Sequence, residues 1–453
     1  MNVKEEKVDV AVIGGVAAGT SAAAAAVREK KDLKVVLFEK DRFISYGGCG
    51  IPYYIEGITK SYEDLIMFTP EAFKKSKGVD VRVLHEVTSI DPVNKTMIVK
   101  NLESAEDTKV YFGKLIVSTG AQSSVPKIDG LEIDDRIFNV RTLEDAIRIR
   151  KFMENQSPKS AVILGGGYVG LEMAEALGTN GISVTIVEMM EHVMPTADPK
   201  MSELIEGELN KNHVKVMTST QLKFVNGGED SVRVGTTNGV IETDMLIVAT
   251  GVKPETELAK SCGIQLGTRD AISVNTKMET NFDDIYSCGD CATVQNRLTG
   301  EETYIPLGTT ANKMGRIAGK NAAGNSESFK GVLGTAVTKI FNLEYAKTGL
   351  TYEEALARFR AGMTLVHSRS KAHYYPGSAP IHVMLVYERG TGRILGAQMA
   401  GAGISKRIDV LASAITANMD IETLSSLDLS YAPPFAPVWD PVLIAANVAK
   451  KEV

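Results

Sequence analysis

Two segments of the chain share one order of features, and this repeat limits the possible folds more than any other part of the sequence. The first reads VDVAVIGGVAAGTSAAAAAVREK and then LKVVLFEK; the second reads SAVILGGGYVGLEMAEALGTNGISVTIVEMM. In each, an apolar run precedes glycines, a helix-forming stretch and another apolar run, which predicts strand, tight turn, helix and strand. Each segment therefore predicts a β-α-β unit of a parallel sheet, and the fold class is α/β.

The second segment carries a complete phosphate-binding pattern. Gly165, Gly167 and Gly170 have the spacing G-x-G-x-x-G, and Glu188 ends the second apolar run. Such a turn allows a pyrophosphate to sit at the helix N-terminus, while the carboxylate accepts hydrogen bonds from a ribose. Two methionines, and no arginine, follow Glu188, which favours NADH over NADPH because a 2′-phosphate would have no cationic partner there.

The first segment matches the same pattern with one departure. Gly14 and Gly19 hold the first and third glycine positions, while Val16 occupies the second, where the backbone should approach a phosphate. Glu39 ends the second strand about 20 residues past the last glycine and is the ribose candidate, with Lys40 beside it. A single glycine pattern can be any tight turn, but two, each with a glutamate at the right distance, favour two bound dinucleotides.

Further positions, later in the chain, are candidates for contact with these cofactors. The segments 114–130 and 244–256 each place a buried strand ahead of a Thr-Gly turn, at Thr119 and Gly120 and at Gly251, and both are predicted crossings between domains. Asp290 follows a strand in YSCGDCATV and could accept a hydrogen bond from a polyol hydroxyl. The helix predicted within 304–324, capped by Thr309 or Thr310, could direct its N-terminus at a bound cofactor, or be an ordinary capped helix.

Composition excludes several classes of function. A length of 453 residues predicts two to four domains of about 150 residues each, and a net charge of −6 gives no indication of nucleic-acid binding. The first residues lack the apolar core of a signal peptide, and no apolar run approaches the roughly 18 residues of a membrane span. The sequence therefore predicts a cytoplasmic protein that binds neither nucleic acid nor membrane.

The four cysteines are too few for a disulfide framework in a chain of this length. CGDC, at 288–291, is a single C-x-x-C without a second pair, and the six histidines lack ligand spacing, so no metal site is predicted. Because these two sulfurs flank Asp290, we interpret them as packing against a cofactor.

Together these motifs resemble the flavoprotein disulfide reductases with two dinucleotide-binding domains, along the whole length of the chain. The resemblance implies FAD in the first Rossmann-like unit and NAD(P)H in the second, with an FAD domain of residues 1–118 and 252–325 and an NAD(P)H domain of 119–251. From about residue 326 alternating apolar runs predict antiparallel strands. The resemblance makes this α+β region, 326–453, the interface of a homodimer whose active sites are shared between subunits.

The stretch SYGGCGIPY, with Cys49, identifies the branch of the family that the chain resembles. Relatives of glutathione reductase carry a second cysteine five residues from the first, but Ile44 and Tyr54 occupy those positions. The chain is therefore similar to the single-cysteine branch, which includes coenzyme A disulfide reductases, persulfide or polysulfide reductases, and NADH oxidases and peroxidases. The ending LSYAPPFAPVWDPVLIAANVAK matches this branch as well.

Cys49 is predicted to be the reactive thiol. If it begins a short helix, with Pro52 in the first turn, its sulfur faces the positive end of the helix dipole. Such a position can lower a cysteine pKa from about 8.5 to roughly 3.5–7.5 and so favour the thiolate. A buried structural cysteine is the alternative, but the surrounding glycines leave Cys49 little side-chain packing.

The resemblance also implies a proton donor. In the coenzyme A disulfide branch a tyrosine from the partner subunit is thought to protonate the departing thiolate, and Tyr431 matches it. A tyrosine of HYYPG, Tyr374 or Tyr375, matches a second tyrosine, and we take Tyr375 as the candidate. All three could instead be interface aromatics. Ser45 matches a motif serine near the sulfur, although it could equally cap the turn.

The acceptor is the least constrained part of the prediction. Coenzyme A carries phosphates, for which Arg28, Lys406 and Arg407 are the substrate-binding candidates, whereas persulfides, polysulfide or sulfur need no such contacts. The peroxidases and water-forming oxidases have a histidine in the first glycine turn, where this chain has Val16 and Ala17. The sequence thus predicts a reductase of coenzyme A disulfide, coenzyme A persulfide or polysulfide, the coenzyme being substrate or mixed disulfide on Cys49. The alternatives are an NADH oxidase in which Cys49 cycles through sulfenic acid, and a non-catalytic flavoprotein that senses NADH.

Overall fold

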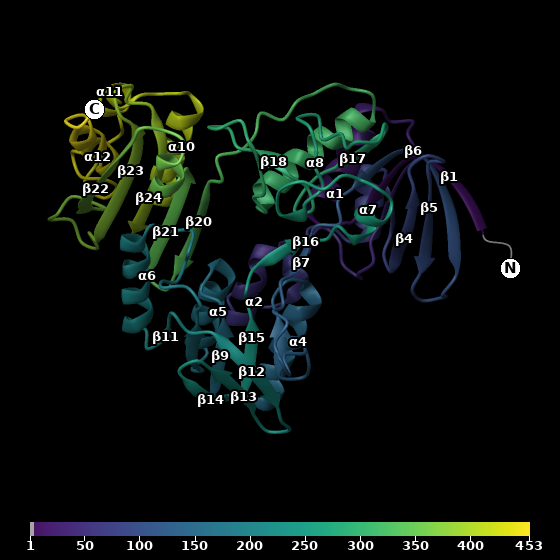
Figure 1. The fold of residues 1–453 in the computed structure, drawn as a ribbon, viewed down its shortest axis with the longest axis horizontal. Coiled ribbons are helices and arrows are strands. Elements are labelled where there is room, and N and C mark those ends of the chain that lie inside the picture. The colour runs from purple at the N-terminus through teal and green to yellow at the C-terminus, as the bar shows by residue number, and fades with distance from the viewer. Residues whose placement is uncertain (1–3) are drawn as a thin grey trace. The chain divides into compact units, whose positions relative to one another are not determined.

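The computed structural model describes residues 4–453, and these divide into two units (Figure 1). Unit 1 contains the described residues up to Ser124 together with Arg141–Ile147 and Val252–Val332. Unit 2 contains Val125–Val140, Arg148–Gly251 and Leu333–Val453. Unit 2 thus includes most of the predicted NAD(P)H domain and most of the predicted dimerisation region, and the finer three-domain boundaries stay a prediction.

Unit 1 is built on a seven-stranded sheet, in the order β3-β2-β1-β6-β5-β4 with β17 on β6. Val12 of β1 lies opposite Leu37 on one side and Ile116 on the other, both in parallel register. The strands β2 and the ends of β1 and β6 are buried on both faces, as expected for continuous apolar runs in a parallel sheet. The strands are β1 (Lys4–Ile13), β2 (Val35–Phe38), β3 (Asp80–Arg82), β4 (His85–Asp91), β5 (Thr96–Asn101), β6 (Asp107–Val117) and β17 (Ile285–Ser287).

Two helices, α1 (Ala17–Glu29) and α8 (Gly308–Ala322), lie side by side in unit 1 (Figure 1). Glycines permit the close approach: a Cβ on Gly319 would lie 2.0 Å from the carbonyl oxygen of Ala22. The predicted threonine cap of α8 is wrong, because the helix begins earlier, after Leu307, and has no side-chain cap.

Smaller elements complete unit 1. They are the 3-10 turns η1 (Gly48–Gly50), η2 (Tyr62–Leu65) and η3 (Thr268–Asp270), the helices α2 (Ile51–Glu56), α3 (Pro70–Lys77) and α7 (Glu257–Ser261), and the strands β7 (Ala121–Ser123), β16 (Val252–Pro254), β18 (Val294–Gln295) and β19 (Glu302–Thr303). The strands β7 and β16 pair with each other in antiparallel register, so the two predicted crossing segments are neighbours.

Unit 2 contains a second parallel sheet with the order β11-β10-β9-β15-β8, and a three-stranded antiparallel sheet, β12-β13-β14. The strands are β8 (Ile137–Asn139), β9 (Ser160–Leu164), β10 (Ser183–Val187), β11 (Lys215–Met217), β12 (Leu222–Gly227), β13 (Val232–Thr236), β14 (Gly239–Thr243) and β15 (Met245–Val248). The helix α5 (Tyr168–Thr179) connects β9 to β10, and α4 (Leu143–Gln156) and α6 (Pro199–Lys211) follow β8 and β10.

The C-terminal part of unit 2 is the predicted α+β region. Its five-stranded antiparallel sheet has the order β20-β21-β24-β23-β22, and every residue of β24 is buried. Helix α12 packs on β22 and β23, and α10 packs on β21 and β24. The elements are β20 (Ala336–Ile340), β21 (Leu343–Gly349), β22 (Ala361–Arg369), β23 (Pro380–Glu388), β24 (Ile394–Gly401), α9 (Tyr352–Leu356), α10 (Ser405–Thr416), α11 (Ile421–Ser425) and α12 (Pro441–Ala449).

The predicted fold class is confirmed: two parallel, Rossmann-like sheets and a C-terminal α+β region. Across residues 4–453, none of the helices combines the length and the apolar character that a membrane span requires.

Candidate active site

The first glycine turn lies between β1 and α1 in unit 1. Gly14 has a φ of +97°, and a Cβ there would lie 2.2 Å from the carbonyl oxygen of Ser118; a Cβ on Gly19 would lie 1.8 Å from the carbonyl oxygen of Gly14. Only glycine fits at either position. The amide of Gly15 donates to the carboxylate of Glu39 at 2.6 Å, and burial raises the pKa of this carboxyl group.

The second glycine turn, in unit 2, repeats this geometry. Gly165 has a φ of +98°, and a Cβ on Gly170 would lie 2.0 Å from the carbonyl oxygen of Gly165. The amide of Gly166 donates to the carboxylate of Glu188 at 2.7 Å. Both predicted ribose acceptors are therefore held against their own glycine turn by a backbone amide.

The middle position of the pattern differs between the two turns. Gly167 precedes α5 with a φ of −80°, which any residue can adopt, and a Cβ there would meet no described atom within 4 Å. Neither strain nor packing within the described chain therefore requires glycine at this position. Open space here fits a phosphate that the backbone approaches closely. In the first turn Val16 occupies the corresponding place before α1.

Two of the predicted crossing residues, Thr119 and Gly120, are ordered by contacts within unit 1. The hydroxyl of Thr119 donates to the carbonyl oxygen of Glu255 at 2.6 Å, and the amide of Glu255 donates to the carbonyl oxygen of Gly120 at 2.9 Å. Gly120 has a φ of +74°, and Gly251 has a φ of +94°. Both glycines adopt the left-handed conformation that the Thr-Gly turns require.

Asp290 has a partner that sequence reasoning missed. The guanidinium of Arg141 lies 3.0 Å from the Asp290 carboxylate, and its Nε donates to the carbonyl oxygen of Ala121 at 2.9 Å. Arg141 thus links the predicted polyol acceptor to the first residue of β7. No local signal could have found this pair, because 149 residues separate its members.

Cys49 lies in the 3-10 turn η1, which leads directly into α2, and its side chain is exposed. The predicted helix is present and begins at Ile51, two residues after the cysteine, with Pro52 in its first turn. The segment that leads into this turn is attached to the first glycine turn, because the amide of Ser45, four residues before Cys49, donates to the carbonyl oxygen of Gly15 at 2.9 Å. The chain is therefore anchored at the first predicted dinucleotide site four residues before the exposed thiol.

Ser45 itself has an unusual backbone conformation. Its φ is +48°, in the left-handed region that costs energy for a residue with a side chain, and its carbonyl oxygen accepts the amide of Met67 at 2.8 Å. Such strain is typical of segments whose position matters for function.

Cys288 and Cys291 are both fully buried and form no disulfide. They belong to different hydrophobic clusters, Cys288 with Val12 and Ala22, and Cys291 with Ala11 and Ile285. Burial raises the pKa of both thiols, so this C-x-x-C has the character of core packing. Among residues 4–453 no group of three or more potential ligands could hold a metal ion.

Tyr431 and Tyr374 lie together in unit 2. Their hydroxyl groups are hydrogen-bonded, which raises the pKa of Tyr431, and the two side chains are 44% and 64% exposed. Tyr375, the member of the Tyr-Tyr pair chosen from the sequence, instead packs its ring against the ammonium group of Lys371, 5.6 Å from the ring centroid. The structure thus joins Tyr431 to the other tyrosine of the pair.

Three other candidate residues each lie in or beside a different element of unit 1. Thr310 is buried in the first turn of α8, Lys40 is exposed after β2, and Arg28 is exposed in the last turn of α1. None of these positions tests the role that was predicted for the residue, so each role stays a prediction.

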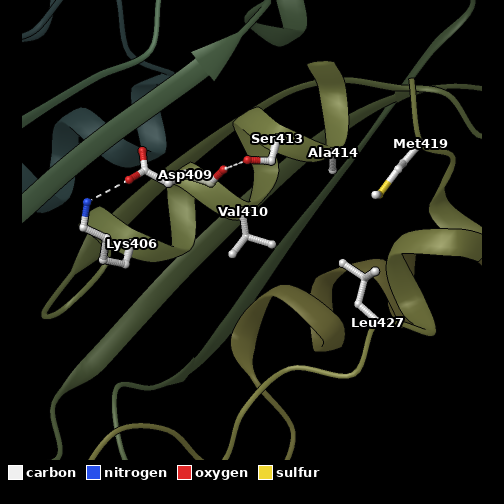
Figure 2. Close-up of a pocket in the computed structure, with 7 residues that line it drawn as sticks. All are labelled: Lys406, Asp409, Val410, Ser413, Ala414, Met419 and Leu427. Carbon is white, nitrogen blue, oxygen red and sulfur yellow. Dashed lines mark hydrogen bonds and ion pairs between the residues drawn. The ribbon is translucent and has the colours of Figure 1, made fainter. Parts of the chain in front are cut away.

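Lys406 and Arg407 begin α10 and have different surroundings. Lys406 is exposed, pairs with Asp409 at 3.0 Å, and lies at one end of a pocket of about 290 Å³ (Figure 2). Met419 and Leu427 give that pocket an apolar lining, and it offers a phosphate only one cation that already has a carboxylate partner. Arg407 is largely buried and bonded within unit 2.

The chain belongs to the pyridine nucleotide-disulphide oxidoreductase family. The family pattern described as "Pyridine nucleotide-disulphide oxidoreductase" matches residues 8–315, and the pattern of its dimerisation domain matches residues 335–441. The family implies FAD and NAD(P)H as cofactors. The two glycine cradles, the open space at Gly167 and the two oriented carboxylates fit such dinucleotides.

Three relatives are similar over nearly the whole chain. The NAD(P)H sulfur oxidoreductase (CoA-dependent) of Pyrococcus furiosus is 38% identical over 98% of this chain and 100% of its own length. The coenzyme A disulfide reductase of Staphylococcus haemolyticus is 32% identical over 94% and 96%. The solved NAD-dependent persulfide reductase of A. fulgidus is 37% identical, with a TM-score of 0.94 over 98% of this chain and 83% of that one.

Proposed function

We propose that the chain is an FAD-dependent reductase that uses NAD(P)H to reduce coenzyme A disulfide, coenzyme A persulfide or polysulfide through Cys49. The observation that carries this proposal is the bond from Ser45 to Gly15, because it joins the turn of an exposed thiol to the first dinucleotide cradle. The names of the relatives, which act on coenzyme A disulfides, persulfides or sulfur, support the same chemistry.

Each cofactor is assigned to one glycine turn. FAD would be held by Gly14, Gly19, Glu39 and Asp290, and NADH by the turn that ends at Glu188. Bound FAD would carry two electrons from NAD(P)H to the sulfur of Cys49. Around it, the ion pair between Arg141 and Asp290 orients the Asp290 carboxylate.

Cys49 acts as the nucleophile in the proposed reaction. Its thiolate attacks one sulfur of coenzyme A disulfide, forms a mixed disulfide and releases one coenzyme A thiolate. Two electrons then cleave the mixed disulfide, which frees the second coenzyme A and restores the Cys49 thiolate. With a persulfide or polysulfide the same thiolate instead attacks the terminal sulfane sulfur, and the coenzyme A thiolate or the shortened polysulfide leaves. Two electrons then cleave the persulfide on Cys49, which releases sulfide and restores the thiolate.

Tyr431 is the proposed proton donor to the departing thiolate, contributed by the partner subunit. Its hydrogen bond with Tyr374 raises the pKa of Tyr431, so the phenol keeps its proton over a wider pH range. This bond makes Tyr374, more than Tyr375, the second tyrosine of the site. The match to a dimerisation domain supports a homodimer, and the exposed aromatic side chains of Tyr431, Phe435 and Trp439 would supply apolar area to its interface.

Several finer assignments remain predictions alongside this proposal. They are phosphate contacts from Arg28 and Lys406, the preference for NADH, the three domain boundaries and the cytoplasmic location.

The direct test is anaerobic NADH oxidation by the flavin-loaded protein, with coenzyme A disulfide and then with polysulfide. We expect turnover with at least one, and its loss in Cys49→Ser with the flavin still bound. Cys262→Ser, which alters a partly buried thiol in the same unit, is the matched control and should keep wild-type turnover. Full activity of Cys49→Ser would contradict the proposal.

The alternatives give distinct results when the anaerobic assay is paired with an aerobic one. Oxygen uptake that matches NADH consumption, with no turnover on either sulfur acceptor, would identify an NADH oxidase. Reduction of the flavin by NADH without turnover on any acceptor would identify the sensor.

A further inference from the structure

The guanidinium of Arg407 is the meeting point of three segments in unit 2. Its Nε donates to the carboxylate of Asp440 at 2.8 Å, and one terminal nitrogen donates to the carbonyl oxygen of Gly403 at 2.9 Å. The other terminal nitrogen donates to the carbonyl oxygens of Ser370 and Phe435, both at 3.2 Å. Four of the five N–H groups of an arginine are thus used within the chain.

The segments that Arg407 holds are those that carry the tyrosine pair. Ser370 is four residues before Tyr374, and Phe435 is four residues after Tyr431. A backbone bond from the amide of Ala372 to the carbonyl oxygen of Pro433, at 3.3 Å, joins the same two segments. Residues 426–440 contain no helix or strand, so their shape depends on such anchors.

The side chain of Asp440, the acidic partner of Arg407, is itself held in place by a helix. It is the N-cap of α12, where one carboxylate oxygen accepts the amide of Val442 at 3.0 Å while the other accepts the Nε of Arg407. The side chains of Arg407 and Asp440 are only 12% and 11% exposed, so solvent screens the pair little. Lysine has a single point charge in place of the planar fork and could not satisfy Asp440, Ser370 and Phe435 together.

We infer that Arg407 is a positioning residue, which fixes the Tyr431–Tyr374 pair in the geometry that proton donation needs, and not a phosphate ligand. Its catalytic consequence rests on the proposed function; the ordering of the segment does not. Arg407 touches no reacting atom in this role and acts through Tyr431.

The sequence offers a direct probe of this role. Trp439 is the only tryptophan, is 59% exposed, and lies between Phe435 and Asp440. Arg407→Lys should lower the fluorescence anisotropy of Trp439, because the segment gains motion. Arg389→Lys is the matched control: Arg389 also lies in unit 2, and its guanidinium donates to the carbonyl oxygen of Glu452 at 3.3 Å, near the last residue of the chain. It should leave the anisotropy unchanged.

Turnover supplies the second readout. We expect Arg407→Lys to lower kcat with the sulfur acceptor by about 10- to 100-fold, the effect of displacing a catalytic group by about 1 Å. Anaerobic reduction of the flavin by NADH should keep its wild-type rate. In a Tyr431→Phe background Arg407→Lys should cause no further loss, because both changes remove the same function.

Asp440→Asn keeps an N-cap oxygen for α12 but removes the charge partner of Arg407. It should reproduce the Trp439 change if Arg407→Lys folds poorly. Wild-type anisotropy in both variants would overturn the inference, as would an equal loss of kcat from Arg407→Lys in the Tyr431→Phe background. Wild-type turnover of Tyr431→Phe would contradict the proposed proton donor, and the anisotropy would then still decide whether Arg407 holds the segment.

Discussion

The carboxylate of Glu39 accepts the amide of Gly15 at 2.6 Å, and the carboxylate of Glu188 accepts the amide of Gly166 at 2.7 Å. In each case the other carboxylate oxygen accepts the amide two residues further along the chain, at 2.9 and 2.8 Å. Both carboxylates are therefore oriented before a ribose arrives, so binding need not order them.

Glu39→Gln should weaken flavin binding, because the amide side chain keeps one acceptor where the carboxylate presents two. Loss of one charged hydrogen bond costs about 1.5–3 kcal/mol, so we expect FAD affinity to fall by at least about tenfold. The ratio of flavin to protein absorbance after gel filtration measures this loss. Glu188→Gln is the control, and it should keep the flavin but bind NADH more weakly; flavin loss from Glu188→Gln alone would reverse the assignment of the two sites.

Gly167→Ala should separate nucleotide binding from folding. A Cβ at Gly167 meets no described atom within 4 Å and its φ of −80° suits alanine, so thermal stability should stay within about 0.5 kcal/mol of wild type. The KM for NADH should rise, because the methyl group occupies space that we assign to a phosphate.

Gly170→Ala is the matched substitution with the opposite expectation. Its Cβ would lie 2.0 Å from the carbonyl oxygen of Gly165, so this variant should lose stability as well as NADH binding. A calorimetric scan of both variants checks the pair. An unchanged KM for NADH in Gly167→Ala would show that the open space there is not used by the nucleotide.

Tyr431→Phe should lower kcat with coenzyme A disulfide by about 10²- to 10⁴-fold, the usual contribution of a general acid. Tyr374→Phe should have a smaller effect on kcat, and Tyr375→Phe should be close to wild type. Because the bond to Tyr374 raises the pKa of Tyr431, its removal lowers that pKa. The alkaline decline of kcat should therefore begin at a lower pH in Tyr374→Phe, and a pH–rate profile measures the shift.

Glu6→Gln should reduce stability in a pH-dependent way. Arg82 donates to the carboxylate of Glu6 at 2.6 and 2.8 Å and lowers the pKa of this group from 4.5 to about 2. A lowered folded-state pKa stabilises the protein fully above 4.5, and this contribution is lost as the pH falls toward 2.

The difference in Tm between wild type and Glu6→Gln should accordingly be largest near neutral pH and shrink below pH 4.5. Glu103→Gln, at an exposed turn position, is the control and should show a small difference that varies little with pH. A constant difference for Glu6→Gln across this range would contradict the role of the ion pair.

The parts of the site that the sequence predicts are those defined by short spacings. The two glycine turns, the carboxylates at Glu39 and Glu188, and the helix after Cys49 all lie within stretches of about 30 residues, where strand, turn and helix preferences act together. The antiparallel C-terminal sheet was predictable for the same reason, because its apolar alternation is local.

The parts that the sequence could not predict depend on side chains that meet across long separations. The bond of Arg141 to Asp290 spans 149 residues, and the bonds of Arg407 join segments that no periodicity relates. The sequence alone does not distinguish Tyr374 from Tyr375, because they are adjacent residues of the same type. Only the folded path of the chain determines that Tyr374 is the one that contacts Tyr431. The threonine cap of α8 was misplaced because Leu307, which has no capping group, precedes the helix.

The first glycine and the carboxylate bond agree closely between the two turns, so neither feature by itself distinguishes one dinucleotide from another. Gly14 and Gly165 differ in φ by one degree, and the two carboxylate bonds differ by 0.1 Å. Two places where the copies diverge, Val16 against Gly167 and Lys40 against the exposed Met189, are therefore candidates for this discrimination. Exchanging these two pairs of residues would therefore ask whether one cradle can be converted into the other.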